Sequence, residues 1–339
     1  MNKHKIGLVG FGRIGKMHAK NIVSDCPNVE IAAIVDSHDD APNKKWMAQH
    51  NIHCPISSDL GLIIDNKEIE TVVIAASTEA HVDIIKAIVP KKKYIFCEKP
   101  VSLESKKIKE VEELLKKNNT LFQVGFNRRF DHQFQMVKKA VEQGKVGNLY
   151  LIKITNRDPY RPPVKFIPKS GGLIRDFNSH DFDMVRFISE KSIEEVTAVG
   201  ANLVDKKIGE LGDIDTVLIT LRLKDGSLAT IDCCRETLYG YDQELEAFGS
   251  KGSVKAHNLR ENTLSLSTRD GVSIAKPFET FVERYRDAYR YQIISFFDCI
   301  QKKTKPPVGI QDIFLALCVA EAANLSLQKK QTITVNYKV

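Results

Sequence analysis

The sequence predicts an α/β protein with an N-terminal doubly wound parallel sheet and a C-terminal α+β domain that contains a large, mostly antiparallel open sheet. The first observation is a glycine-rich turn directly after the first apolar run. The second is the alternation of short apolar runs with amphipathic helical segments through the first third of the chain, which is typical of a parallel sheet covered on both faces. The third is a change near Gly125 to longer runs in which apolar and polar residues alternate.

The glycine turn has the spacing of a Rossmann dinucleotide-binding fingerprint, with Gly10, Gly12 and Gly15 after the apolar run 6–9. Gly10 would allow a tight turn, Gly12 a close approach of backbone to a pyrophosphate, and Gly15 close packing of the helix that follows. Asp36 closes the second apolar run, about twenty residues further on, where a ribose-binding carboxylate is expected. A carboxylate there favours NAD over NADP, because it would repel a 2′-phosphate. An ordinary β–α turn is the alternative interpretation.

The remaining elements follow from periodicity. Further parallel strands are expected at 31–35, 72–76, 94–97 and 121–124, with amphipathic helices around residues 84–88 and 108–115. Beyond them, strands are expected at 149–155, 217–223, 228–233, 245–248 and 263–267, with hairpin turns at residues 225–226 and 270–271. Two late helices are expected at about 281–302 and 311–329. We therefore expect an NAD-binding domain at 1–125 and a substrate-binding and oligomerisation domain at 126–339.

Composition limits the classes of function. The net charge of +7 arises from 50 basic and 43 acidic residues among 339, and much of it lies in short lysine clusters. Nucleic acid is therefore not an expected partner. The seven cysteines form no CxxC pair, which favours reduced thiols. With no uncharged apolar stretch of membrane-spanning length and no room for a signal peptide, we expect a cytoplasmic protein without a membrane partner.

Candidate catalytic residues come from two segments. Lys99 lies in the sequence Glu98-Lys99-Pro100, directly after the run 94–97, and ligands of open α/β sheets bind beyond the carboxyl ends of such strands. Its ammonium could polarise a substrate oxygen or relay a proton, although an exposed surface lysine is the plain alternative.

The second segment runs from Gly171 to Phe187. If the chain is helical from Asp176 onward, Asp176 and His180 share one face, and a carboxylate beside an imidazole suits a general acid/base. A helix-capping aspartate with a core histidine is the structural alternative. A metal site is not expected, since no further ligand recurs at metal spacing.

Several polar residues lie at expected strand ends or in aromatic clusters, where they could bind the hydroxyls of a small polyol. Each is as well explained by solvation or packing. The candidate pocket residues are Arg128, Asn156, Asp158, Tyr239, Tyr285 and Tyr289.

These motifs, in their order and spacing, resemble the glucose–fructose oxidoreductase/inositol dehydrogenase/rhizopine catabolism (Gfo/Idh/MocA) superfamily, and within it bacterial inositol 2-dehydrogenases. The segments that carry the likeness are 10–15, 97–100, 125–130, 156–159, 171–180 and 239–242. The resemblance implies that Lys99, Asp176 and His180 are a catalytic trio, and that a hydride passes to nicotinamide C4 of NAD from a carbon bearing a hydroxyl. It implies a homotetramer built through the open sheets. It also implies cofactor contacts by Arg13, Ile14, Ser77, His81, Glu98 and Lys99.

The function expected from this resemblance is the oxidation of myo-inositol to 2-keto-myo-inositol (scyllo-inosose). A related sugar or scyllo-inositol dehydrogenase is an alternative within the superfamily. A catalytically inactive dinucleotide-binding regulator is an alternative from another class, although it would not need to keep the trio. Whether Lys99 or His180 is the immediate base stays open at this point.

Overall fold

The computed structural model describes residues 3–38 and 40–338. The described chain divides into two compact units. The first contains the chain up to Asn127 together with Tyr289–Phe314, and the second contains Arg128–Ala288 and Leu315–Lys338. The sequence pattern predicted that the whole region after residue 125 belongs to the second domain. The main difference is the segment Tyr289–Phe314, which lies in the first unit. Its apolar residues account for it, because they pack in the core of the first unit.

The sheet of the first unit has the strand order β3-β2-β1-β4-β5-β6, and every pairing in it is parallel. This is the Rossmann order, in which the chain reverses direction across the sheet between β1 and β4. The predicted parallel sheet is therefore confirmed, with β3 as an added edge strand. The strands are β1 (His4–Val9), β2 (Val29–Val35), β3 (Ile56–Ser57), β4 (Thr71–Ile74), β5 (Tyr94–Cys97) and β6 (Phe122–Val124).

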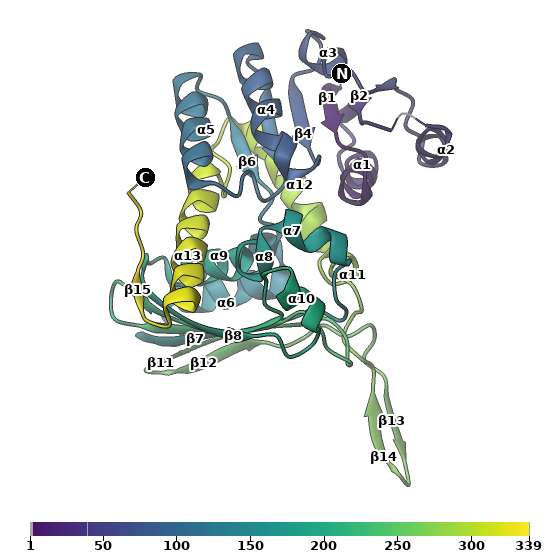
Figure 1. Ribbon diagram of the computed structural model, residues 1–339. Helices are drawn as coiled ribbons and strands as arrows, with labels where there is room; N and C mark the ends of the chain where they lie inside the picture. Colours follow the sequence, from purple (N-terminus) through teal and green to yellow (C-terminus); the bar gives the residue numbers. More distant parts are fainter. Residues whose placement is uncertain (1–2, 39, 339) are drawn as a thin grey trace. The chain divides into compact units, whose positions relative to one another are not determined.

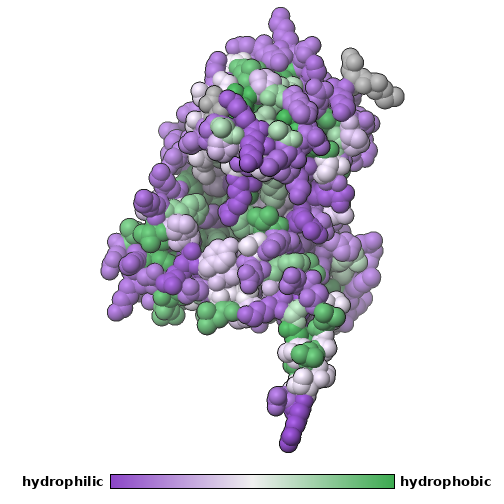
Figure 2. All heavy atoms as spheres, turned by 90° about the vertical axis from the view of Figure 1, so that its right-hand side faces the viewer, coloured by the Kyte–Doolittle hydropathy of each residue, from purple (hydrophilic) through white to green (hydrophobic). Residues whose placement is uncertain are grey.

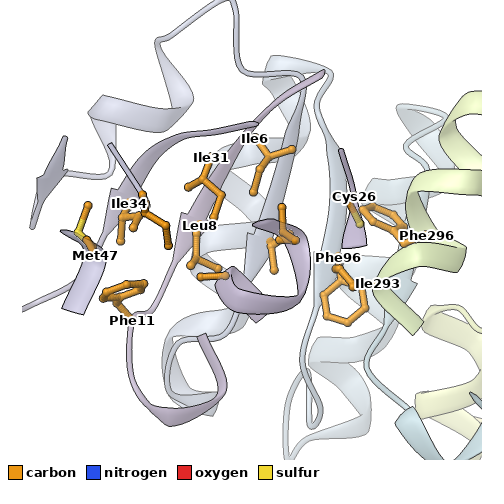
Figure 3. Close-up of a cluster of buried hydrophobic side chains, with 14 residues drawn as sticks. Ile6, Leu8, Phe11, Cys26, Ile31, Ile34, Met47, Phe96, Ile293 and Phe296 are labelled. Atoms are coloured by element: carbon orange, nitrogen blue, oxygen red, sulfur yellow. The ribbon is translucent and has the colours of Figure 1, made fainter. Parts of the chain in front are cut away.

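Helices cover both faces of this sheet, which explains why its strands read as continuous apolar runs (Figure 1). A core of buried side chains joins β1 and β2 to the helix α12, whose Ile293 and Phe296 pack beside Phe96 and Cys26 (Figure 3). The helices are α1 (Arg13–Asp25), α2 (Ala41–Gln49), α3 (Gly61–Ile64), α4 (Thr78–Ile88), α5 (Ser105–Lys117) and α12 (Arg286–Lys302), with a 3-10 turn at Val89–Lys91.

The second unit contains a seven-stranded sheet with the order β12-β11-β7-β10-β9-β8-β15. Only the β7–β10 pairing is parallel, so the predicted mostly antiparallel sheet is also confirmed. Its strands are β7 (Leu149–Arg157), β8 (Ile193–Ala201), β9 (Thr216–Leu223), β10 (Leu228–Cys234), β11 (Asp242–Gly249), β12 (Gly252–Ala256) and β15 (Ile333–Thr334).

The helices of this unit lie on one face of the sheet, and the opposite face is open (Figure 1). Alternation along β9 illustrates the division, because Val217, Ile219 and Leu221 are buried while Leu218 between them is 57% exposed. Phe248 and Leu228 are also exposed on this sheet, at positions that pair with Leu151 of β7. The helices are α6 (His132–Glu142), α7 (Ile167–Ser170), α8 (Gly172–Asp176), α9 (Asn178–Ser189), α10 (Lys206–Glu210), α11 (Phe281–Arg284) and α13 (Ile310–Lys329), with 3-10 turns at Asn127–Phe130 and Val164–Phe166. Helix α13 belongs to this unit from Leu315 onward.

A two-stranded hairpin, β13 (Ser265–Thr268) with β14 (Gly271–Ile274), projects from the second unit (Figure 1). The predicted turn at residues 270–271 forms its tip. Leu264 and Leu266 are exposed on the first strand and its approach, and Val272 and Ile274 on the second. Figure 2 shows apolar residues along this projection and a hydrophilic tip. The hairpin therefore presents an exposed apolar surface of four side chains.

The helix α13 is long and apolar enough, by length and composition, to cross a membrane, and 56% of its most apolar window is buried. Core helices of globular proteins have the same character, and Phe314, Val319 and Ala323 of α13 are fully or almost fully buried. The charged residues Asp312 and Glu321 interrupt its apolar sequence.

Candidate active site

The three glycines of the β1–α1 turn have the environments that their predicted roles require. Gly10 has a φ of +90°, and a Cβ there would lie 2.4 Å from the backbone nitrogen of Ala76. A Cβ on Gly15 would lie 1.9 Å from the carbonyl oxygen of Gly10, so only glycine allows the helix to pack this closely. A Cβ on Gly12 would meet nothing within 4 Å. The space beside Gly12 at the start of α1 is therefore open, as close approach of a pyrophosphate would require.

Asp36 lies directly after β2, at the same edge of the sheet. Its carboxylate accepts hydrogen bonds from the backbone N–H groups of Phe11 at 2.5 Å and His38 at 2.8 Å. The side chain therefore holds the glycine turn in place and stays partly accessible, as a ribose-binding carboxylate must. Asp39, two residues before the helix α2, lies outside the described residues. Arg13 is exposed and Ile14 half-buried in the first turn of α1, and their cofactor contacts stay a prediction.

Ser77 and His81 follow β4, but only one of them is accessible. Ser77 is exposed at the start of α4. His81 is 1% exposed, and its ring nitrogens lie 2.9 Å from the carbonyl oxygen of Pro100 and 3.0 Å from that of Ala76. Burial lowers the pKa of His81, against the opposing effect of these carbonyl groups. His81 therefore ties the end of β4 to the Lys99–Pro100 segment, and this geometry does not favour a direct contact with the cofactor.

Lys99 is half-buried just beyond the end of β5, where the sequence analysis placed it. The neighbouring Glu98 points inward instead. Its carboxylate is 2.7 Å from Nε2 of His18, a histidine of α1 that is completely buried. No local pattern in the sequence joins residues that are 80 positions apart, so this pair could not be predicted. Glu98, predicted to contact the cofactor, is thus engaged with the protein interior.

Asp176 and His180 lie in the second unit, so the predicted catalytic residues are divided between the two units. Asp176 ends α8, Phe177 separates the helices, and α9 begins at Asn178. The expected continuous helix is therefore broken by one residue, although Phe177 keeps helical angles of −84° and −58°. Both side chains are half-buried. The orienting role of Asp176 toward His180 stays a prediction.

A buried polar network fills the interior beside α9. Asp181 accepts hydrogen bonds from Arg128 at 2.6 Å, Asn156 at 2.7 Å and Asn178 at 2.9 Å. Gln243 donates to the carbonyl oxygen of the Asn156 side chain at 2.6 Å. Each group is buried, and the network satisfies most of its polar atoms, as low dielectric surroundings demand. Arg128 and Asn156, predicted to bind substrate, are thus buried and engaged with Asp181, and their contact with substrate stays a prediction.

Tyr285 extends the same network. Its hydroxyl donates to Gln243 at 3.0 Å, and burial raises the pKa of Tyr285 to about 12. Burial alone would lower the pKa of Arg128, but the nearby Tyr285 and Asp181 raise it above its usual value. Both shifts favour a neutral phenol and a charged guanidinium near neutral pH. Tyr285 is a buried anchor, so its predicted contact with substrate is not favoured by this geometry.

The remaining pocket candidates differ in accessibility. Tyr239 is 42% exposed, accepts a hydrogen bond from Arg157 at 2.8 Å and donates one to Asp242 at 2.5 Å. Asp158 is half-buried just after β7. Tyr289 is 7% exposed in the first unit, where its ring lies 6.2 Å from that of His18. Tyr239 and Asp158 remain candidates for substrate contact, whereas the ring of Tyr289 packs against that of His18.

Among the residues that the structure describes, no group of three or more histidine, cysteine or acidic side chains could hold a metal ion. The groups that could hold a dinucleotide are the glycine turn, the start of α1 and Asp36. Their arrangement fits that cofactor, since the space at Gly12 is open while the other two glycines are closely packed.

Comparison with known proteins agrees with this geometry. Residues 4–126 match an oxidoreductase family with an NAD-binding Rossmann fold, and residues 134–255 match the GFO/IDH/MocA C-terminal domain. The chain is 41% identical to an uncharacterized oxidoreductase of Bacillus subtilis, with 98% of this chain and 96% of the relative covered. It is 38% identical to a myo-inositol 2-dehydrogenase of Thermotoga maritima, with 97% and 98% covered. The solved scyllo-inositol dehydrogenase of Lactobacillus casei with bound NAD(H) and scyllo-inositol superposes with a TM-score of 0.91, at 26% identity and with 98% and 99% covered.

The fold, the glycine turn and these matches together define an NAD-dependent oxidoreductase. The strand order places its cofactor site at the carboxyl edge of the parallel sheet. The chain belongs to the GFO/IDH/MocA family, and it carries both domains of that family.

Proposed function

We propose that this protein oxidises myo-inositol to 2-keto-myo-inositol (scyllo-inosose) with NAD as the hydride acceptor. The observation that carries the proposal is the likeness, over nearly the whole chain, to a protein named myo-inositol 2-dehydrogenase, in a sequence that has Lys99, Asp176 and His180. When bound, NAD+ supplies the redox chemistry by accepting a hydride at nicotinamide C4.

The chain's own residues supply binding and proton transfer. Gly12 and the first turn of α1 would hold the pyrophosphate, and Asp36 the ribose hydroxyls. Lys99 and His180 would act on the reacting hydroxyl: one removes its proton as the hydride leaves, and the cation stabilises the developing alkoxide. Asp176 would orient His180. The hydroxyl proton, removed by the base, passes to water, so the reaction yields ketone, NADH and one proton.

A second candidate substrate is scyllo-inositol, because relatives with that activity in their names match most of this chain. The two inositols differ only in the configuration of one hydroxyl, so the same acid/base groups would serve both. Asp158 and Tyr239, which are accessible in the second unit, are the residues that we propose discriminate between them.

The test is NADH formation, followed by absorbance, with a panel of inositols and aldoses. Turnover of myo-inositol with the highest kcat/KM supports the proposal, and a preference for another isomer or sugar replaces it. A protein that binds NAD but is silent with the whole panel would be a regulator or would act on a substrate outside the panel. Lys99→Ala should bind NADH normally and lose activity; unchanged turnover in that variant would refute the role of Lys99.

We also propose that the protein is a cytoplasmic homotetramer. The open sheet face, with Leu218 at 57% exposure, and the projecting hairpin, with Leu266 at 64% and Val272 at 69%, support association with further copies. Light scattering after size-exclusion chromatography should give four times the chain mass of 38.2 kDa. The double variant Leu266→Ser/Val272→Ser should give a smaller species, and an unchanged mass would exclude the hairpin from the interface.

A further inference from the structure

Glu98 is a buried acidic side chain for which the proposed reaction has no direct use. It is 8% exposed although it is adjacent in sequence to Lys99, and its Oε1 lies 2.7 Å from Nε2 of His18. Removing a carboxylate from water costs several kcal/mol unless hydrogen bonds replace its hydration. A buried carboxylate in this place therefore requires an explanation.

The Glu98 carboxylate contacts several separate segments of the first unit. Its Oε1 is 3.4 Å from Nε2 of Gln292 on α12, and its Oε2 is 3.3 Å from the backbone nitrogen of Lys99. A Cβ on Gly125, just after β6, would lie 2.6 Å from Oε2 of Glu98. A larger residue at position 125 would therefore clash with the carboxylate in its present position. The side chain thus joins the ends of β5 and β6 to α1 and α12.

His18 is held in one orientation by its surroundings. Its ring lies 5.1 Å from that of Phe96 and 6.2 Å from that of Tyr289, both in edge-on contact. Its Nδ1 is buried, and the structure gives that atom no hydrogen-bond partner. A proton on Nδ1 would be a buried unpaired donor, which is costly, so the favoured tautomer carries its proton on Nε2 and donates it to Glu98.

We propose that Glu98 and His18 are positioning residues that fix the Lys99 segment to α1, the helix whose first turn holds the cofactor phosphates. His18 lies three residues after Gly15, so one hydrogen bond links the phosphate-binding turn to the backbone that carries Lys99. The pair sets where the Lys99 amine lies relative to bound cofactor. The inference rests on the proposed role of Lys99 as a residue that acts on the substrate hydroxyl.

The test compares His18→Leu, which removes the donor, with His18→Gln, whose side-chain amide can still donate to Glu98. His18→Leu should lower kcat at least about tenfold while the Kd for NADH changes less than about threefold, and His18→Gln should recover most of the loss. Ile22→Val is the matched control, because it weakens the packing of the same buried helix without reaching Glu98. Equal losses in all three variants would overturn the proposal.

A second measurement separates this inference from the proposed function. Competitive acetylation, followed by mass spectrometry of the peptide that contains Lys99, reports the pH profile of that amine without any substrate. His18→Leu should shift the profile and His18→Gln should not. If the wild type turns over no polyol but His18→Leu still shifts the pH profile of the Lys99 amine, only the proposed function fails. If His18→Leu and His18→Gln give the same profile, the positioning role is refuted.

Discussion

The substitution Gly12→Ala separates cofactor binding from folding. Gly12 has an extended backbone with φ of −72°, and a methyl group there would meet no protein atom within 4 Å. The folded chain therefore accommodates alanine without a clash. Gly12 is the residue before the first turn of α1, where alanine is a poorer cap than glycine but reduces the entropy of the unfolded chain. We expect the free energy of unfolding to change by less than about 1 kcal/mol.

The bound pyrophosphate should not tolerate the same methyl group. The open space at Gly12 is where the phosphates approach the N–H groups of α1, and a hydrogen bond to a charged group contributes roughly 1.5–3 kcal/mol. Displacing the phosphates from two such groups would weaken binding by about 3 kcal/mol. This corresponds to an increase in the Kd for NADH on the order of 100-fold.

The assay is a fluorescence titration with NADH, paired with urea unfolding of the same protein. Gly15→Ala is the contrasting variant, because its Cβ would lie 1.9 Å from the Gly10 carbonyl oxygen and should destabilise the fold by about 3 kcal/mol. A Kd within about threefold of wild type in Gly12→Ala would show that the phosphates do not lie at Gly12.

Three further predictions concern stability. Asp215→Asn should lower the free energy of unfolding in urea by about 2–3 kcal/mol. The buried carboxylate accepts hydrogen bonds from the N–H groups of Leu203, Val204 and Asp205 and from the hydroxyl of Thr216. A loss below about 0.5 kcal/mol would contradict this prediction. Phe296→Ala should lower the free energy of unfolding in urea by about 3–5 kcal/mol, because it leaves a cavity beside Phe96. If Phe296→Ala were as stable as Phe296→Leu, this packing would be refuted. Burial lowers the pKa of His81, so at a pH just below the ordinary histidine pKa the unfolded state binds a proton that the folded state does not. Stability should therefore be full above about pH 6.5 and fall as the pH drops below it, and His81→Gln should flatten part of that slope in a pH series of melts.

Periodicity predicted many of the elements because the spacing of apolar residues along a strand or helix shows which of its faces is buried. The apolar run of β1 with its glycine turn, and the alternation along β9, indicated the class of each sheet. Strands β3, β8, β12 and β15 were not predicted, and the strand expected at 263–267 lies in the separate hairpin β13–β14. The long-range partners were not accessible in this way. Nothing local to Asp181 indicates that Arg128 and Asn156 converge on it, and nothing in α12 indicates that Ile293 and Phe296 belong to the core of the first unit. A pattern shows that a side chain is buried, but only the fold shows what it is buried against.

That placement of α12 has a consequence for how the protein is made. The N-terminal sheet is complete once residue 124 has been synthesised, but Ile293 and Phe296, which cover Phe96, come much later in the chain. Domains generally fold as units while the ribosome is still elongating the chain. Here the first unit cannot close its core until α12 has left the ribosome, and the second unit still lacks residues 315–338 at that stage. Neither unit is therefore complete until the last part of the chain has been synthesised, although the strands of the first sheet are present from residue 124 onward.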